Sequence, residues 1–208
     1  NFHIDQGDLF VLELDPADPE RYRHDGGWKR FDKVEEAIAV KDGAPVAATL
    51  RYSVQGPVLS WNPEKRRATA LATIAMQPGG DGAFAMIAIN LARDWEGLRK
   101  AFALHPSPTN FHYADVDGNT GWQVIGFVPV RKRGDGLLPV PGDGRYDWTG
   151  MRKFEALPSA YNPAKGWFAS ANQNNLPADW PRDRIPAFSF RDPYRYDRIA
   201  EVLASQPR

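Results

Sequence analysis

The chain has 208 residues, enough for one large domain or two small ones, and 42% of them are hydrophobic, which suffices for a packed core. Its 26 basic and 26 acidic residues balance, so no overall field favours nucleic acid or an anionic bilayer, and we expect neither partner. No apolar run reaches the roughly 18 residues of a membrane-spanning helix, and the lack of cysteine excludes disulfides and thiolate metal sites within these residues. Because the chain opens at 1–5 on what reads as the middle of a strand, we expect a processed chain or a piece of a larger one.

The first sixty residues predict a meandering antiparallel sheet. Strand-like stretches at 8–14, 36–40 and 47–54 are separated by polar turns around 25–27 and 41–44. Beyond them, two apolar stretches at 68–75 and 83–91 flank a glycine-rich turn.

Two segments predict helices. Residues 94–102 place Trp95, Leu98 and Phe102 on one helical face, so this helix should pack on a sheet. Near the end of the chain, 197–204 shows a second helical pattern.

Residues 111–130 contain the stretch Asp-Val-Asp-Gly-Asn, which resembles the start of a calcium-binding loop. An EF-hand loop needs glycine at its sixth position and a glutamate at its twelfth, whereas counting from Asp115 puts Gly118 at the fourth and Gly126 at the twelfth. The stretch therefore predicts a β-hairpin that turns at 117–119 and continues with alternating apolar residues from Trp122.

The remaining half of the chain predicts long irregular loops. The segment 134–144 contains two prolines that donate no amide hydrogen bond, so it is not a central strand. No repeat or linker marks an internal boundary, and we treat 1–208 as a single segment.

Three features have chemical potential. Asp5 and Asp8 flank Gly7, a spacing that suits either one hard cation or a turn with solvated carboxylates. Four amides at 172–175 are either turn caps or donors for an oxyanion. Arg198 reads as one half of a surface ion pair. The histidines lack the spacing of a helical zinc site and receive no catalytic role: His3, His24, His105 and His112.

An ordered series of motifs extends over nearly the whole chain. It consists of DQGDLF at 5–10, YADVDGNTG at 113–121, LPVPG at 138–142 with DWTG at 147–150, YNP at 161–163, ANQNN at 171–175 and YDR at 196–198. In this order and at these separations, the motifs resemble an internal segment of the large chain of penicillin acylases (penicillin amidases), which are N-terminal-nucleophile hydrolases.

The resemblance implies a fold and a chemistry. The fold is α+β: an antiparallel, β-rich segment of an αββα sandwich, with one or two helices and long loops. The chemistry is hydrolysis of an N-acyl amide through an acyl-enzyme, on a serine that self-cleavage exposes as the first residue of the large chain and that lies outside these residues. The α-amino group of that serine, with an ordinary pKa of about 8, acts as its general base, so no catalytic histidine is needed.

The resemblance also implies roles for individual residues. Asn174 would donate its side-chain amide to the oxyanion, the backbone amide of Asn1 would supply a second donor, and Arg198 would lie beside the amino terminus of the nucleophile. Asp5, Asp8 and Asp183 would bind one structural calcium ion in the complete enzyme.

The resemblance also implies partner chains, a substrate class and a cellular location. The small chain and the remainder of the large chain would complete the enzyme, its substrate would be a small N-acyl amine such as a penicillin or an acyl-homoserine lactone, and its location would be periplasmic or secreted. Only Met86 and Thr109 fall near positions that line the acyl pocket. In one departure, Gln55-Gly56-Pro57 stands where the family often has His-Gly-Pro.

A second hypothesis needs no catalysis. Seven tryptophans and seven tyrosines among many short strands would also suit a carbohydrate-binding β-domain, with Trp61, Trp148 and Trp167 as stacking platforms. The ordered motifs favour the hydrolase.

Overall fold

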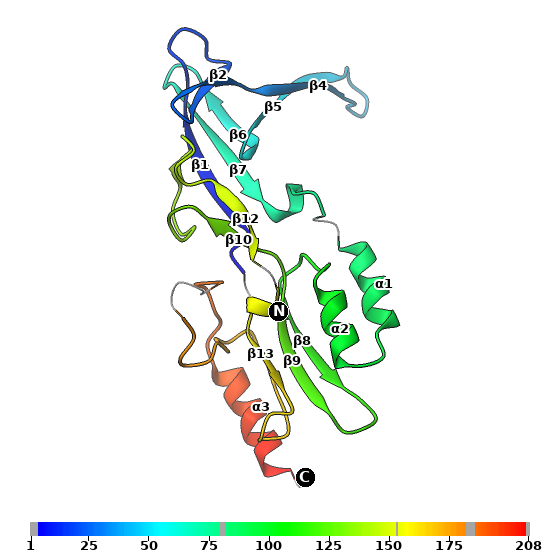
Figure 1. Cartoon of the computed structure of the whole chain (residues 1–208). Helices are drawn as coiled ribbons and strands as arrows, with labels where there is room; N and C mark the ends of the chain where they lie inside the picture. The colour runs from blue at the N-terminus through cyan, green and yellow to red at the C-terminus, as the bar shows by residue number, and fades with distance from the viewer. Residues whose placement is uncertain (1–3, 80–81, 153, 182–185, 207–208) are drawn as a thin grey trace. The chain divides into compact units, whose positions relative to one another are not determined.

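The chain folds into two compact units (Figure 1). The computed structural model describes residues 4–79, 82–152, 154–181 and 186–206. Unit 1 comprises 1–6, 77–129 and 151–208, and unit 2 comprises 7–76 and 130–150. Each unit combines segments far apart in the sequence, which explains why no linker marks a boundary.

Unit 2 contains a six-stranded sheet in the order β11-β1-β7-β6-β5-β4. All neighbouring strands are antiparallel except β1 and β11, which are parallel. A hairpin of β2 and β3 and a short 3-10 turn at Ile74–Met76 complete the unit. The strands are β1 (Gly7–Glu13), β2 (Arg21–His24), β3 (Gly27–Arg30), β4 (Asp32–Ile38), β5 (Val46–Ser53), β6 (Gly56–Asn62), β7 (Arg67–Thr73) and β11 (Val140–Pro141).

The core of unit 2 follows from alternation along β1 and β7. Phe10 and Leu12 are fully buried and lie opposite the small residues Ala70 and Ala68. Because successive side chains of a strand point to opposite faces, this alternation places one face of the sheet in the core. Gly142 follows β11 where a Cβ atom would overlap the buried side chain of Leu12, so glycine allows this close approach without displacing Leu12.

Unit 1 contains a three-stranded antiparallel sheet in the order β13-β9-β8. Its hairpin confirms the one predicted around 117–119, and Asp115 holds the turn by accepting the backbone N–H groups of Asp117 and Asn119. The bounds are β8 (Thr109–Ala114), β9 (Thr120–Ile125), β13 (Ser159–Tyr161), α1 (Ala83–Leu91), α2 (Trp95–Phe102), α3 (Tyr194–Ser205) and a 3-10 turn at Phe154–Ala156. A further two-stranded sheet pairs β10 (Val128–Arg131) with β12 (Trp148–Arg152).

Helix α2 forms where the sequence predicts it. The side chain of Asp94 caps its first turn by accepting the Gly97 N–H, and the predicted apolar face is buried against the β8–β9 hairpin through Trp95, Leu98 and Phe102. Helix α3 likewise contains the predicted segment 197–204.

The α+β class is confirmed, with three α-helices among the described residues where one or two are predicted. The additional helix is α1, whose nine residues carry no charge and therefore show no polar–apolar period. No helix within the described ranges combines the length and apolar composition that crossing a membrane requires.

Candidate functional site

The loop at 169–176, called the amide loop below, carries the cluster of side-chain amides singled out in the sequence. Asn172 has a positive φ of 68°, a backbone region that asparagine tolerates better than most residues. Gln173 is buried and accepts the Ala171 N–H at 2.7 Å, and the Asn172 carbonyl accepts the Arg191 N–H at 2.8 Å. The loop is therefore held by its own side chains and by the segment that precedes α3.

Asn174 is exposed on this loop. Its Oδ1 accepts the backbone N–H of Leu176 at 3.1 Å, which forms an Asx turn and fixes the side chain. Within the described residues its Nδ2 group makes no hydrogen bond, so the amide keeps two N–H groups for an external acceptor. The two roles considered for the cluster, turn cap and oxyanion donor, are thus compatible at this residue because they use different atoms.

The next residue, Asn175, attaches the amide loop to β8. Its Nδ2 donates to Asn110 Oδ1 at 2.9 Å, and the same oxygen accepts the indole N–H of Trp122 at 2.7 Å. Trp122 is buried and stacks on Phe168 with ring centroids 4.1 Å apart, which also anchors the segment that leads into the loop. Sequence analysis missed Asn110, since nothing in its neighbourhood distinguishes it from a surface asparagine.

Two arginines of α3 behave differently. Arg195 donates from Nη2 to the Ala171 carbonyl and to Asn172 Oδ1, so it contacts the amide loop at two points. Arg198 is 69% exposed and pairs with Glu201 at 2.7 Å, one turn along the same helix. The residue singled out in the sequence therefore forms the surface ion pair described for it, and the arginine at the loop lies three positions earlier.

A serine and a histidine meet at the start of the amide loop. His112 Nε2 and Ser170 Oγ lie 3.1 Å apart at an exposed position, and partial desolvation of the ring lowers the pKa of His112, which favours the neutral imidazole at neutral pH. No carboxylate of the described residues contacts the other ring nitrogen, so the orienting acid of a Ser-His-Asp triad is absent from this part of the chain.

Asp8 lies in a different setting, within unit 2. Arg131 forms a two-point ion pair with its carboxylate, Nε to Oδ2 and Nη2 to Oδ1, both at 2.8 Å, and the Trp148 indole also donates to Oδ2. The Asp8 side chain is 4% exposed and that of Arg131 is 11% exposed. Since an ionised carboxylate accepts about four hydrogen bonds, these three hydrogen bonds leave room for roughly one further ligand.

The other predicted calcium ligands are less fully described. Asp5 belongs to unit 1, where its N–H donates to the Pro186 carbonyl at 2.9 Å. Asp183 and Asn1 lie outside the described residues. Within the ranges that are described, no three acidic or histidine side chains gather as a metal site. The predicted calcium set and the predicted donor at Asn1 stay predictions.

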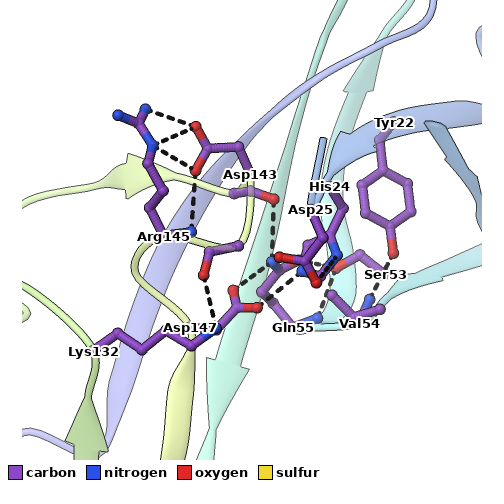
Figure 2. A network of polar contacts seen from close by, with 12 residues as sticks. Tyr22, His24, Asp25, Ser53, Val54, Gln55, Lys132, Asp143, Arg145 and Asp147 are labelled. Atoms are coloured by element: carbon purple, nitrogen blue, oxygen red, sulfur yellow. Dashed lines mark hydrogen bonds and ion pairs between the residues drawn. The ribbon is translucent and has the colours of Figure 1, made fainter. Parts of the chain in front are cut away.

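A buried polar network in unit 2 contains His24 and Gln55 (Figure 2). Asp147 accepts from Gln55 Nε2 at 2.9 Å through Oδ1, and its Oδ2 lies 2.9 Å from His24 Nε2. Ser53 donates to Gln55 Oε1 at 3.0 Å and makes no hydrogen bond with His24. Because the serine and the histidine are separated by Gln55 and Asp147, the network orders the loops of unit 2 and is no nucleophile–base pair.

Each unit also has a cavity. One of about 690 Å³ lies in unit 2 next to this network and is lined by charged residues of both signs. Asp143 and Arg145 in its wall form an ion pair at 2.6 Å, and this hydrogen-bonded guanidinium lowers the pKa of Asp143. One of about 330 Å³ lies in unit 1 and is mainly apolar. Neither cavity is lined by residues of the amide loop.

The tryptophans of the carbohydrate hypothesis do not form open stacking platforms. Trp61 and Trp148 pack on the core of unit 2, and their indole N–H groups donate to the Pro19 carbonyl and to Asp8. Trp167 is half-buried and is covered by the ammonium group of Lys165, 4.1 Å from its ring centroid.

Comparison with known proteins identifies the class of protein. Residues 1–208 match the penicillin amidase family, and the chain belongs to that family. It is 34% identical to penicillin G acylase of Escherichia coli over 208 residues, covering 98% of this chain and 24% of that protein. It is 31% identical to the acyl-homoserine lactone acylase QuiP of Pseudomonas syringae pv. tomato, covering 99% of this chain and 25% of that protein.

A solved structure agrees. The thermostable penicillin G acylase from Alcaligenes faecalis superposes with a TM-score of 0.82 at 25% identity, over 97% of this chain and 36% of that chain. The chain thus has the fold of a penicillin acylase segment and spans about a quarter of the length of the curated relatives.

Proposed function

We propose that the complete protein is an amidohydrolase that cleaves an N-acyl amide through an acyl-enzyme on an N-terminal serine outside these 208 residues. One observation within this chain carries the proposal. Asn174 is held by its Oδ1 while its Nδ2 group remains available to an external acceptor. This is the arrangement that a preorganised oxyanion donor requires, because the donor needs no reorganisation when charge appears.

The proposed reaction assigns this chain to stabilisation of the tetrahedral intermediate. The serine hydroxyl attacks the amide carbonyl, its α-amino group takes the proton and passes it to the leaving amine, and water then hydrolyses the acyl-enzyme. Asn174 Nδ2 and the backbone N–H of Asn1 would donate to the oxyanion. Two donors are preferred since negative charge on one oxygen is shared between them.

Arg195 is proposed to position the amide loop. Its two contacts, to the Ala171 carbonyl and to the side chain of Asn172, hold the part of the loop that leads to Asn174. Arg198, the arginine assigned by resemblance, keeps a predicted role beside the serine amino terminus, although its partner in this chain is the exposed Glu201.

Substrate and metal are proposed at the level of class. The names of the relatives, penicillin acylase and acyl-homoserine lactone acylase, share cleavage of an N-acyl group, so the substrate class is a small N-acyl amine. A structural calcium ion held by Asp5, Asp8 and Asp183 is compatible with the remaining acceptor capacity of Asp8, and it would stabilise the fold without taking part in the reaction. The small chain and the rest of the large chain as partners, self-cleavage of a precursor, and a periplasmic or secreted location are proposed from family membership.

The test uses the complete enzyme. We expect turnover of chromogenic N-acyl substrates, and rapid acid quenching followed by mass spectrometry should find one acyl group on the N-terminal serine peptide. The 208-residue chain alone should show no turnover above a buffer blank, because it lacks the nucleophile. An acyl group trapped on Ser170 would instead identify the Ser170–His112 pair as the nucleophile and overturn the proposal.

A further inference from the structure

Helix α1 presents large apolar side chains to solvent. Phe84, Ile87 and Leu91 are 75%, 58% and 74% exposed, and Met86 is 48% exposed. The nine residues of the helix include no charged residue, and Asn90 is the one polar side chain among them. In globular proteins such a helix is normally buried on all sides.

One side of the helix packs in the core of unit 1. Ala85 and Ile89 are buried, and Ile89 joins the cluster that contains Trp95 and Phe102 of α2. Figure 1 shows α2 between α1 and the β8–β9 hairpin. Phe84, Ile87 and Leu91 are spaced by three and four residues and so form one row along the helix, called the outer stripe below.

The outer stripe differs from ordinary exposed apolar residues. Single apolar side chains on a surface need no explanation, whereas a contiguous row marks a surface that another apolar group covers. Ala85 faces inward while Phe84, Ile87 and Leu91 face water, an arrangement that favours a second packing partner on the outer face.

We propose that the outer stripe of α1 is an interface covered by acylase polypeptide outside these 208 residues. The chain spans 24% of the Escherichia coli relative and 36% of the solved acylase chain, so most of the fold lies outside it. α1 has no cation for an anionic membrane surface, and its outer stripe has three side chains, whereas each partner of a stable dimer contributes about 20–30 residues. The inference needs only family membership and is independent of the proposed chemistry.

Cysteine labelling of the complete enzyme tests this interface. The 208 residues contain no cysteine, so Ile87→Cys and Leu91→Cys each introduce one small apolar reporter into this region. Val116→Cys, at the fully exposed tip of the β8–β9 hairpin, is the matched control. Labelling of the native enzyme by a maleimide, relative to the same variant in denaturant, should be at least about tenfold slower at 87 and 91 than at 116, because reaction requires local opening.

Three outcomes would overturn the interface. Equal relative rates at 87, 91 and 116 would show that α1 remains in water. Protection that appears only when an N-acyl substrate analogue is added would assign the outer stripe to the substrate. Protection that disappears on dilution of the enzyme would assign it to a second copy. Labelling needs no turnover, so an inactive enzyme with protected reporters would contradict the proposed reaction and support the interface.

Discussion

Asn175 Nδ2 donates a hydrogen bond to Asn110 Oδ1 at 2.9 Å, which ties the residue after Asn174 to strand β8. The orientation of both amides follows from a third group. The Trp122 indole is a donor only, so the Asn110 atom 2.7 Å away from it must be oxygen, and the Asn175 atom facing that oxygen must be nitrogen. Asn110 therefore acts as an acceptor in both bonds.

This geometry predicts opposite results for two substitutions of Asn110. Asn110→Leu removes the acceptor, frees the amide loop beside Asn174, and should lower kcat of the complete enzyme about 10- to 100-fold, the usual scale for small misplacement of a catalytic group. Asn110→Asp keeps an oxygen for both donors and should retain most of kcat. Steady-state kinetics with purified, self-cleaved variants measures this, with KM expected to change less than kcat. Equal losses in both variants would mean that Asn110 serves only the fold.

The two arginines of α3 give a second matched pair. Arg195→Met removes both contacts to the amide loop and should lower kcat at least about tenfold, because the loop that carries Asn174 loses its support from α3. Arg198→Met removes an exposed ion pair worth about 0–1 kcal/mol, so it should change stability little and lower kcat only through the role proposed for Arg198 beside the serine amino terminus. A kcat within about threefold of wild type for Arg198→Met would exclude that role.

Local patterns in the sequence predict the elements that have a regular period. β1 alternates buried and exposed residues along Gly7–Glu13, and α2 begins at a capping aspartate and keeps one apolar face, so both were predicted close to their bounds. α1 has no polar face and shows no helical period. A helical period in hydrophobicity appears only when one face of the helix is apolar and the opposite face is polar. The sequence of α1 has no such division.

Local sequence patterns do not predict contacts between segments that are far apart in the chain. Asp8 and Arg131 are 123 residues apart, and the sequence offers Asp8 only a nearby carboxylate at Asp5. Arg195 and Arg198 lie on one helix three residues apart, and only the position of the amide loop distinguishes them. Asn174 was found by its motif, while its supporting residue Asn110 required the fold.

The Asp8–Arg131 pair predicts a stability effect that is separate from calcium. With calcium removed by a chelator, Arg131→Met leaves a carboxylate that is 4% exposed without its cation and should destabilise the complete enzyme by about 3–5 kcal/mol in denaturant unfolding. Under the same conditions, Asp8→Leu combined with Arg131→Met should recover much of this loss, because no buried charge remains.

Chelation tests the calcium proposal on the same residues. A chelator should lower the melting temperature of the wild-type enzyme and have little effect on Asp5→Asn, which keeps the Asp8–Arg131 pair intact. Identical shifts in both proteins would exclude Asp5 as a calcium ligand.

The hairpin turn predicts a pH dependence. The Asn119 side chain donates a hydrogen bond to Asp115, and the Tyr113 hydroxyl donates a second one. Both lower the pKa of Asp115 below the ordinary 3.8, with the larger effect from Asn119. The hydrogen bond to Asp115 also raises the pKa of Tyr113 to about 12. Because the folded-state pKa of Asp115 is below its unfolded value, the ionised carboxylate stabilises the fold at pH values above the unfolded pKa. This contribution is lost as the pH falls through the folded-state pKa. The melting temperatures of wild type and Asp115→Asn should therefore differ more at pH 6 than at pH 2.5. Asp117→Asn in the same turn is the control, and a gap independent of pH would contradict the assignment.

The final prediction concerns Asn174, whose free Nδ2 group carries the proposed mechanism. Asn174→Ala in the complete enzyme should lower kcat about 10²- to 10³-fold, or roughly 2.7–4 kcal/mol of transition-state stabilisation, because the lost donor acts where negative charge develops. KM should change less, since the ground-state carbonyl accepts this hydrogen bond only weakly.

Asn174→Asp separates the two roles of this side chain. The carboxylate keeps an oxygen for the Leu176 N–H, so the Asx turn survives, but it has no N–H for the oxyanion and places negative charge beside it. Asn174→Asp should therefore lose at least as much kcat as Asn174→Ala while melting close to wild type. A kcat within about threefold of wild type for either variant, with normal folding and self-cleavage, would remove Asn174 from the oxyanion site, because loss of such a donor costs far more than that.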